Sequence, residues 1–406
     1  MIPLIDKKNN RPIVLVANSS WYLFHYRKKL IESLKKSDQV ITISPFDENT
    51  KNLELISLNI LWKINRSKEN NIFSFSKSLL RMILIIRTIK PKLIHSHTIK
   101  ANLVIAFVSF IFDIPNILSF TGLGRLSNGN IIARNFLKII LKIILFLSTH
   151  KLSKKNLITH SPNRGYFIFQ NPRDLDYFFS HIDSKKVYNY SLIYGSGLPK
   201  YYFTDKKLPQ NIWINDFKRN TLSTKEIDII FCGRLIKAKG IDLFLEIAKS
   251  IDIKNAFIFG SKNHDSINFL TKKEILFYKK EFENINFLGN IIDPLLKVNS
   301  KNPILIVPSL YGEGISRTIL EAMCLGIPVI CSKNAAVNVF TEKVLYISKG
   351  DEIKDYINCI EKVKSDFDNN ILNEKLHIAK SWCISNFKEE KIVNQTKKVY
   401  SNLKVI

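Results

Sequence analysis

Short apolar runs alternate with longer, partly apolar stretches along most of the chain. The short runs are typical of buried strands and the longer stretches of helices, so their alternation indicates an α/β fold with parallel sheets. In the first half, the pattern predicts helices over residues 22–36, 73–90, 101–112 and 131–148 and strands over residues 12–17, 40–44, 56–61, 92–95, 117–119 and 157–159.

A second series of the same kind begins near residue 226, after a polar and irregular stretch that follows Pro199. That stretch is the best candidate for a linker between two domains. The second series predicts strands over residues 227–232, 256–260, 286–288, 304–307, 328–331 and 344–347, and a last helix over residues 388–403. Two doubly wound domains are therefore expected, with a ligand-binding cleft between the carboxyl ends of their sheets.

Composition limits the class of protein. With 46% hydrophobic and 24% charged residues, the 406-residue chain is typical of a soluble globular protein and excludes a disordered chain or a disulfide scaffold. Its five cysteines form no CxxC pair, which favours reduced thiols in a cytoplasmic protein. The N-terminus lacks a signal-peptide pattern, and no apolar run reaches the ~20 residues of a spanning helix, so we expect a protein that does not cross a membrane.

The charge is strongly positive and unevenly distributed. Lys and Arg number 61 against 35 Asp and Glu, a net charge of +26. Residues 1–200 contain 30 basic and 11 acidic residues, and residues 201–406 contain 31 and 24, so the first half has fewer than half as many acidic residues as the second. A genomic bias toward Lys would not remove carboxylates from one half. We expect a cationic face on the first half and an anionic partner: nucleic acid, an acidic membrane surface or a phosphorylated substrate.

One predicted helix concentrates this charge. Over residues 131–148, Arg134, Lys138 and Lys142 recur every four residues and so share one face, while the other positions are almost all Ile, Leu or Phe. Such a helix can lie in a membrane interface and contact anionic headgroups. The alternative is a buried helix with one solvated face, but the acid-free surroundings favour peripheral membrane contact.

The strongest chemical signal is the segment GEGISRTILE over residues 312–321, which follows a predicted buried strand. A strand, a glycine turn and a helix N-terminus present free backbone N–H groups and the positive end of the helix dipole to a phosphate. Glu313 precedes the helix and Glu321 lies about two turns later, so both can face one ligand. Either carboxylate alone could be a helix-end or solvated residue, but the pair at this spacing favours a site.

A second segment, FCGRLIKAKG over residues 231–240, also follows a predicted strand. Gly233 lets the backbone leave the sheet sharply. Arg234 and Lys239 then project from the sheet edge, where a guanidinium and an ammonium can share a diphosphate. Such residues are commonly just solvated, but beside the Glu313 loop they complete a nucleotide-diphosphate cradle.

These two segments resemble the retaining family 4 glycosyltransferases of the GT-B fold. The likeness rests on GRLxxxKG after a strand, on the two glutamates eight residues apart, and on the AMxxGxPV pattern that begins at Ala322. Further similar segments are residues 91–97, 121–124, 195–197 and 286–289. Within the family, the chain is most similar to bacterial enzymes that extend undecaprenyl-diphosphate-linked sugars in capsule, O-antigen or lipopolysaccharide assembly.

The resemblance implies two Rossmann-like domains facing each other across a cleft. Residues 1–203 would face the acceptor and the membrane, residues 204–385 would bind the nucleotide sugar, and the C-terminal helix, residues 386–406, would return to the first domain. The implied partners are a nucleotide diphosphate sugar, a lipid-linked glycan and an anionic membrane surface at the inner face of the plasma membrane.

Carried over by position, the resemblance also implies residue roles. Arg234 and Lys239 would hold the donor diphosphate and stabilise the charge on the leaving nucleotide, Glu313 would bind donor-sugar hydroxyls, and Glu321 would bind the ribose. The remaining donor-binding residues would be Gly233, Gly260, Leu288, Gly314, Ile315, Ser316 and Arg317. The acceptor side would contain Asn18, Ser19, Trp21, His97, Thr121 and Gly122.

The implied reaction transfers a sugar, such as a UDP-linked N-acetylhexosamine, to a hydroxyl of the acceptor and keeps the anomeric configuration. Many family members have His where this chain has Thr121, so no side-chain base is evident here. The leaving diphosphate is therefore expected to accept the acceptor's proton. No cofactor is expected beyond the nucleotide sugar as co-substrate.

Two other classes remain open from the residues. The basic first half permits a nucleic-acid-binding protein, but it lacks interleaved surface aromatics and any RRM, KH, helix-turn-helix or zinc-finger pattern, so we expect no nucleic-acid partner. A sugar-nucleotide epimerase or phosphorylase of the same fold is the other alternative.

A catalytic metal is not expected. His95 and His97 alternate on one strand, but no third ligand lies at a suitable spacing, so hydrogen bonding within the fold is favoured. The pairs Asp174/Asp176 and Asp366/Asp368 match the DxD motif of the other glycosyltransferase fold, but neither ends an apolar strand.

Overall fold

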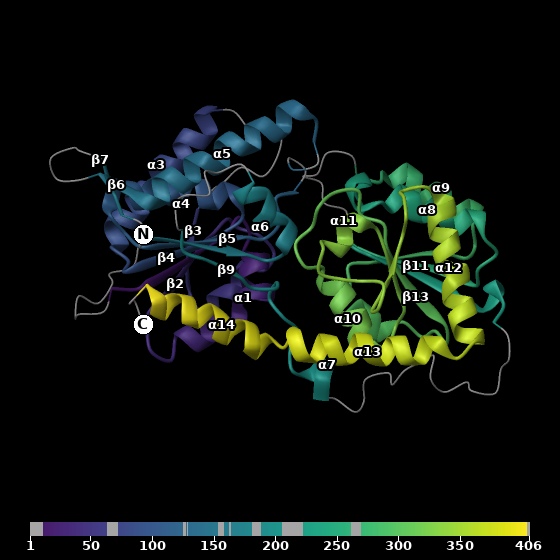
Figure 1. Ribbon diagram of the computed structural model, residues 1–406. Helices are drawn as coiled ribbons and strands as arrows, with labels where there is room; N and C mark the ends of the chain where they lie inside the picture. Colours follow the sequence, from purple (N-terminus) through teal and green to yellow (C-terminus); the bar gives the residue numbers. More distant parts are fainter. Residues whose placement is uncertain are drawn as a thin grey trace. The chain divides into compact units, whose positions relative to one another are not determined.

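The computed structural model describes residues 11–62, 72–124, 127, 129–152, 158–161, 164–180, 188–204, 222–260 and 269–403. The chain divides into two compact units, drawn in Figure 1. The first contains Met1–Gly197 and Glu389–Ile406, and the second contains Leu198–Lys388. Most of the expected linker, residues 205–221, lies outside the described residues.

The first unit is built on a seven-stranded parallel sheet in the order β3-β2-β1-β4-β5-β8-β9. The strand order reverses between β1 and β4, and open α/β sheets bind ligands beyond the carboxyl ends of the strands at such a switch point. The strands are β1 (Ile13–Val16), β2 (Val40–Ser44), β3 (Leu58–Leu61), β4 (Leu93–His97), β5 (Asn116–Phe120), β8 (Gly165–Phe169) and β9 (Tyr190–Leu192).

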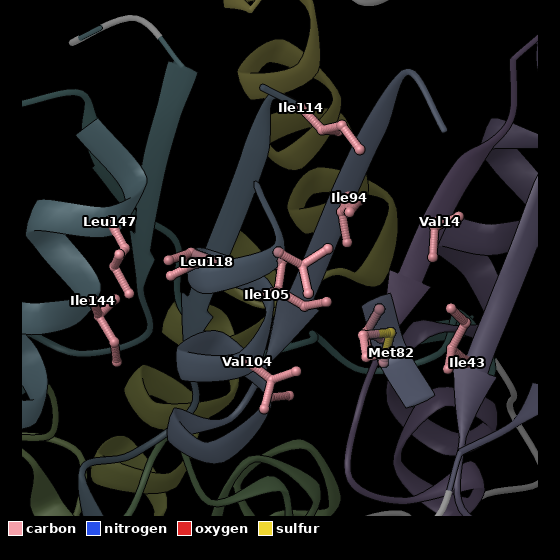
Figure 2. Close-up of a cluster of buried hydrophobic side chains, with 14 of the residues drawn as sticks. Val14, Ile43, Met82, Ile94, Val104, Ile105, Ile114, Leu118, Ile144 and Leu147 are labelled. Carbon is pink, nitrogen blue, oxygen red and sulfur yellow. The ribbon is translucent and has the colours of Figure 1, made fainter. Parts of the chain in front are cut away.

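Helices cover both faces of this sheet. They are α1 (Ser20–Leu34), α2 (Thr50–Glu54), α3 (Ile72–Ile89), α4 (Ile99–Phe112), α5 (Ile131–Thr149), α6 (Pro172–Phe179) and α14 (Glu389–Asn402). Successive strand residues point to opposite faces, so Ile13 and Leu15 pack with α1 and α14, whereas Val14 and Val16 pack with α3, α4 and α5. Figure 2 shows this second layer, in which strand residues Val14, Ile43, Ile94 and Leu118 lie beside helix residues Met82, Val104, Ile105 and Ile144.

The second unit is built on a six-stranded parallel sheet in the order β12-β11-β10-β13-β14-β15, with its switch point between β10 and β13. Its strands are β10 (Asp228–Cys232), β11 (Asn255–Phe259), β12 (Ile285–Gly289), β13 (Pro303–Val307), β14 (Val329–Cys331) and β15 (Tyr346–Ile347). Its α-helices are α7 (Tyr201–Thr204), α8 (Ile241–Ser250), α9 (Lys272–Glu281), α10 (Arg317–Leu325), α11 (Lys333–Ala336), α12 (Ile353–Asp368) and α13 (Ile371–Asn386).

The predicted α/β class with two doubly wound parallel sheets is confirmed. The helix predicted over residues 131–148 is α5, and the last predicted helix is α14, which shares a buried cluster with α1. Among the helices in the described part of the chain, none has the length and apolarity needed to span a bilayer.

The sequence pattern left part of the first sheet unpredicted. The strand predicted over residues 157–159 is present as β7 (Ile158–His160), but it pairs with β6 (His150–Leu152) in an antiparallel hairpin separate from the main sheet. The place beside β5 is taken by β8, whose five residues are all buried. Asp366 lies within α12, where its carboxylate accepts a hydrogen bond from Tyr346.

Candidate functional site

In the second unit, the loop after β10 lies against the loop after β13. The Leu310 amide donates to the Ala238 carbonyl at 3.0 Å, and Gly240 has a φ of 75°. A Cβ at Gly240 would lie 1.9 Å from the Pro308 carbonyl oxygen, so only glycine permits this approach. The two predicted motifs, distant in sequence, are therefore joined at neighbouring strand ends on either side of the switch point.

The centre of this arrangement is an ion pair between the motifs. The Lys239 ammonium lies 2.5 Å from the Glu313 carboxylate, and the two side chains are 20% and 9% exposed. Lys239 also lies 5.4 Å from the centre of the Tyr311 ring, and Arg234 Nη2 donates to the Tyr311 hydroxyl at 3.3 Å. Tyr311 thus links both cations of the predicted diphosphate cradle.

Electrostatics keep Lys239 charged. Burial alone would lower the pKa of its ammonium, but Glu313 and Tyr311 together raise that pKa above its usual value. Lys239 is therefore a fixed positive charge at neutral pH, and the exposed Arg234 guanidinium adds a second one beside it.

The start of α10 supplies the third part of the site. Ser316 is the N-cap residue, but its side chain makes no capping hydrogen bond. The first N–H groups of a helix have no partner within the helix, and they carry the positive end of its dipole. Gly314, Ile315, Ser316 and Arg317 are all partly exposed here, so an anion can reach this backbone.

Glu321 lies deeper on α10. Arg317 Nε lies 2.8 Å from its carboxylate, and the Glu321 side chain is buried. Burial raises the pKa of Glu321, while Arg317 lowers it in part. The Tyr202 hydroxyl is within hydrogen-bond reach of Glu321 and also donates to Asp293 at 3.1 Å.

Asp293 connects this group to the loop after β12. It has a φ of 49°, and it accepts a further hydrogen bond from Tyr201 at 2.9 Å. Burial and the Asp293 carboxylate raise the pKa of Tyr201 to about 12, so its hydroxyl stays protonated and donates. Tyr202 and Asp293 could not be selected from the sequence, whereas Tyr311 directly precedes the GEG segment and could have been selected there.

The other predicted donor residues lie at the same sheet edge. Gly260 follows β11, and a Cβ there would lie 1.8 Å from the Gly233 carbonyl oxygen. The backbones after β10 and β11 can therefore approach this closely only with glycine at position 260. Leu288 is an exposed residue near the end of β12. The structure therefore brings together all the predicted donor residues along the carboxyl ends of β10, β11, β12 and β13.

In the first unit, the predicted residues after β1 form the start of α1. Ser19 is the N-cap and accepts from the Tyr22 amide at 3.3 Å, while both the Ser19 hydroxyl and the Trp21 amide donate to Asp47. Trp21 is exposed, and Asn18 is partly exposed. These residues lie beyond the carboxyl end of β1, at the switch point of the sheet.

His97 ends β4 but is fully buried, with His95 and Tyr22 as ring neighbours at 4.2 and 5.3 Å. Burial, helped by the positive charge of Arg27, holds the pKa of His97 well below its usual value, so the ring is neutral. The predicted hydrogen bonding within the fold is confirmed for His95, which bonds to Tyr400 at 2.7 Å and to Ser119 at 2.8 Å. It is wrong for His97, because neither of its ring nitrogens has a hydrogen-bond partner among the described residues.

The turns after β4 and β5 complete this edge. Thr98 has a φ of 80°, which a β-branched residue rarely adopts, and such strain is concentrated at functional edges. Thr121 and Gly122 are partly exposed directly after β5, and Gly122 has a φ of 121°. The Leu123 amide of the same loop donates to Asp174, a buried carboxylate at the start of α6.

The predicted membrane residues lie on α5. Arg134 and Lys142 are exposed and Lys138 is partly exposed. In the part of the chain that the structure describes, no three His, Cys, Asp or Glu side chains gather as metal ligands would.

Comparison with known proteins agrees with this geometry. Residues 226–366 match the family model described as "Glycosyl transferases group 1". The chain is 25% identical over 345 residues to the capsular polysaccharide biosynthesis glycosyltransferase CapM of Staphylococcus aureus, with 83% of each chain covered.

Solved structures show the same fold. Sucrose-phosphate synthase from Thermosynechococcus elongatus matches with a TM-score of 0.72 at 16% identity, covering 97% of this chain and 99% of that one. Anabaena Alr3699/HepE in complex with UDP-glucose matches with a TM-score of 0.68 at 16% identity, covering 96% and 99%. These likenesses confirm the expected GT-B class of α/β fold.

Proposed function

We propose that this chain, whose residues 226–366 match the family model for glycosyl transferases group 1, is a glycosyltransferase that transfers a sugar from a UDP-linked donor to a lipid-linked glycan and retains the anomeric configuration. A capsule-biosynthesis relative and a structural relative solved with UDP-glucose support the donor and the pathway class. The proposal also includes membership of glycosyltransferase family 4 and an N-acetylhexosamine as the transferred sugar.

The observation that carries the proposal is the joined pair of loops in the second unit. It places Lys239, Arg234 and the start of α10 around one sheet edge, where each contributes positive charge. A diphosphate carries its negative charge on several oxygens, so a point charge, a forked guanidinium and a set of N–H groups complement it. The same groups stabilise the charge that grows on the leaving nucleotide.

Glu313 has the position for the donor sugar. Its carboxylate is held by Lys239 directly beside the diphosphate-binding groups, and sugar hydroxyls are hydrogen-bond donors that a carboxylate accepts. Glu321, fixed by Arg317 deeper on α10, would accept from the ribose hydroxyls.

The proposed chemistry is a front-face displacement. The bond between the anomeric carbon and the diphosphate oxygen breaks while the acceptor oxygen bonds to the same face of that carbon. The acceptor's proton passes to the departing phosphate oxygen, and UDP leaves. His97 is buried and neutral in its unit, which agrees with a reaction that uses no histidine base from this strand.

A ligand screen tests the donor class. Binding of the correct nucleotide raises the melting temperature by mass action, so UDP and UDP-sugars should raise it more than GDP, ADP and their sugars at equal concentration. A larger shift with GDP or ADP would replace UDP in the proposal. No shift with any nucleotide diphosphate would contradict the proposed cradle itself.

The acceptor class has its own test. Purified protein, a radiolabelled UDP-sugar and an organic extract of bacterial lipid-linked sugars should give label in the lipid phase with release of UDP. Label only in water-soluble sugar would contradict a lipid-linked acceptor while leaving the donor assignment intact.

A further inference from the structure

Helix α5 carries an exposed row of large apolar side chains along its whole length. Successive members are four, three, four and three residues apart, which places them on one face of a helix. This apolar stripe consists of Ile132, Phe136, Ile139, Ile143 and Phe146, which are between 43% and 75% exposed.

The apolar stripe is not the face that packs on the sheet. Leu137, Leu141 and Ile144 are buried in the core of the first unit and fill the other side of α5. A surface helix of a globular domain normally has polar residues opposite its buried face. Helix α5 therefore has two apolar faces, of which the structure buries one.

The charges beside the apolar stripe are all positive. Arg134 and Lys142 are exposed next to it, Lys138 is partly exposed, and residues 131–149 contain no Asp or Glu. Helix α3 packs against α4 on the same side of the sheet (Figure 1). Its sequence repeats this combination of apolar and basic residues.

On α3, Leu80 and Leu84 are 62% and 61% exposed. Lys77, Arg81 and Arg87 are exposed on the same helix, and residues 72–89 contain no acid. Two helices on one side of the unit thus combine exposed large apolar residues with uncompensated positive charge.

We propose that α3 and α5 form a bilayer-binding face that inserts the apolar stripe and the two α3 leucines below the headgroups of an anionic membrane. Apolar residues that penetrate the interface with Lys and Arg at headgroup level are the chemistry of interfacial helices. This assigns insertion to the apolar stripe and adds α3 to the contact, beyond attraction by the α5 cations alone.

The position of α5 in the chain relates this face to substrate. The loop that leaves the carboxyl end of β5 contains Thr121 and Gly122 and leads directly into α5. Ile131 and Ile132, at the first turn of the helix, are 67% and 75% exposed. A bilayer held at α5 would therefore lie near the edge where the first unit is expected to receive its acceptor, an inference that rests on the proposed lipid-linked acceptor.

Vesicle binding of matched variants tests the face. Phe136→Ser/Ile139→Ser should bind phosphatidylglycerol-containing phosphatidylcholine vesicles at least about tenfold more weakly than the wild type, at low and at high salt. Lys138→Gln/Lys142→Gln should weaken binding at low salt only, because salt screens exposed charges. The changed side chains are exposed or partly exposed, so the variants should keep the wild-type melting temperature.

Helix α9 of the second unit provides the controls, since it also exposes two large apolar residues and several lysines. Leu276→Ser/Phe277→Ser and Lys272→Gln/Lys273→Gln should bind vesicles like the wild type. As a direct readout of insertion, Ile139→Trp should give a blue-shifted tryptophan signal that brominated lipids quench.

Wild-type affinity for vesicles in the Phe136→Ser/Ile139→Ser variant would overturn the proposal. So would a wild-type dimer that this variant dissociates without any vesicle binding, because the apolar stripe would then bind a second copy. UDP binding is measured in parallel: vesicle binding without UDP binding would contradict the proposed function and keep the bilayer-binding face. UDP binding without vesicle binding would contradict the bilayer-binding face and keep the proposed function.

Discussion

Gly240 joins the two loops of the donor site through a backbone contact that no other residue allows. A Cβ on Gly240 would lie 1.9 Å from the Pro308 carbonyl oxygen, and the residue has a φ of 75°. Gly233, in the same loop, has room, because a Cβ there would meet only the Phe231 ring at 3.7 Å. The close approach of the loops therefore requires glycine at position 240, whereas the space at position 233 admits a side chain, although both residues belong to one motif.

We predict that Gly240→Ala destabilises the protein by at least about 2 kcal/mol, because the left-handed backbone and the collision both oppose the side chain. Gly233→Ala should change stability by less than about 1 kcal/mol. Thermal unfolding of both variants measures the difference, and equal melting temperatures would contradict the close approach of the loops.

Lys239 is the less exposed of the two cations in the predicted diphosphate cradle. Lys239→Gln removes the charge that faces the proposed diphosphate and should lower kcat/KM by a factor of about 10²–10³, as loss of one electrostatic stabiliser does. Lys237, two residues earlier and paired with Asp242 at the surface, is the matched control. Lys237→Gln should retain wild-type turnover of UDP-sugar, and a similar loss in both variants would show that net charge, not position, matters.

The buried Asp174 carboxyl makes the stability of the first unit depend on pH. Burial raises the pKa of this carboxyl to about 6, against about 4 in an unfolded chain. The folded state therefore binds this proton more tightly, and its stability falls as pH rises from about 4 through about 6, by up to about 3 kcal/mol.

Asp174→Asn cannot ionise, so its stability relative to the wild type should increase between pH 4 and pH 7. Chemical unfolding of both proteins across this range gives the comparison. A constant difference at every pH would show that the Asp174 carboxyl ionises normally in the folded protein.

At the scale of elements, Arg164 fixes the ends of two helices. It is buried, and it donates to the Ser109 carbonyl of α4 at 2.7 Å and to the Ser148 carbonyl of α5 at 3.2 Å, with further bonds to the carbonyls of Leu147 and His150. The last carbonyls of a helix lack partners within it, so one guanidinium satisfies several at once.

Arg164→Ala should destabilise the first unit by about 3 kcal/mol or more, because several buried carbonyl groups lose their donor. Arg134→Ala removes an exposed arginine from α5 and should leave the melting temperature nearly unchanged. Thermal unfolding compares them, and a stable Arg164→Ala protein would contradict the assigned role.

A feature could be predicted from the sequence when the residues that form it lie close together in the chain. The donor loops were predictable because each combines a buried strand, a glycine and charged residues within a dozen positions. Tyr202 and Asp293 were not, because they meet Glu321 only through tertiary packing between α7, α10 and the loop after β12. The pairing of β8, rather than β7, with β5 was likewise not predictable, because an apolar pattern does not specify which strands pair.

The charge asymmetry between the two halves of the chain has a structural counterpart within the first unit. The sequence predicted a cationic helix from Arg134, Lys138 and Lys142. It did not predict which apolar residues of this helix would remain exposed, because the sequence does not show which apolar face packs on the sheet. The excess of basic residues thus lies beside an exposed apolar surface. Binding to a bilayer requires such an apolar surface, whereas binding to nucleic acid does not.

The proposed function depends first on the joined loops of the second unit binding a nucleotide diphosphate. Calorimetric titration of UDP into the wild type, Arg234→Ala and Lys237→Ala measures this binding, because Arg234 is exposed and its loss should not disturb the fold. We expect about tenfold to hundredfold weaker UDP binding for Arg234→Ala, as loss of a charged hydrogen bond gives, and wild-type affinity for Lys237→Ala. Equal UDP affinity in all three proteins would rule out a diphosphate site at these loops.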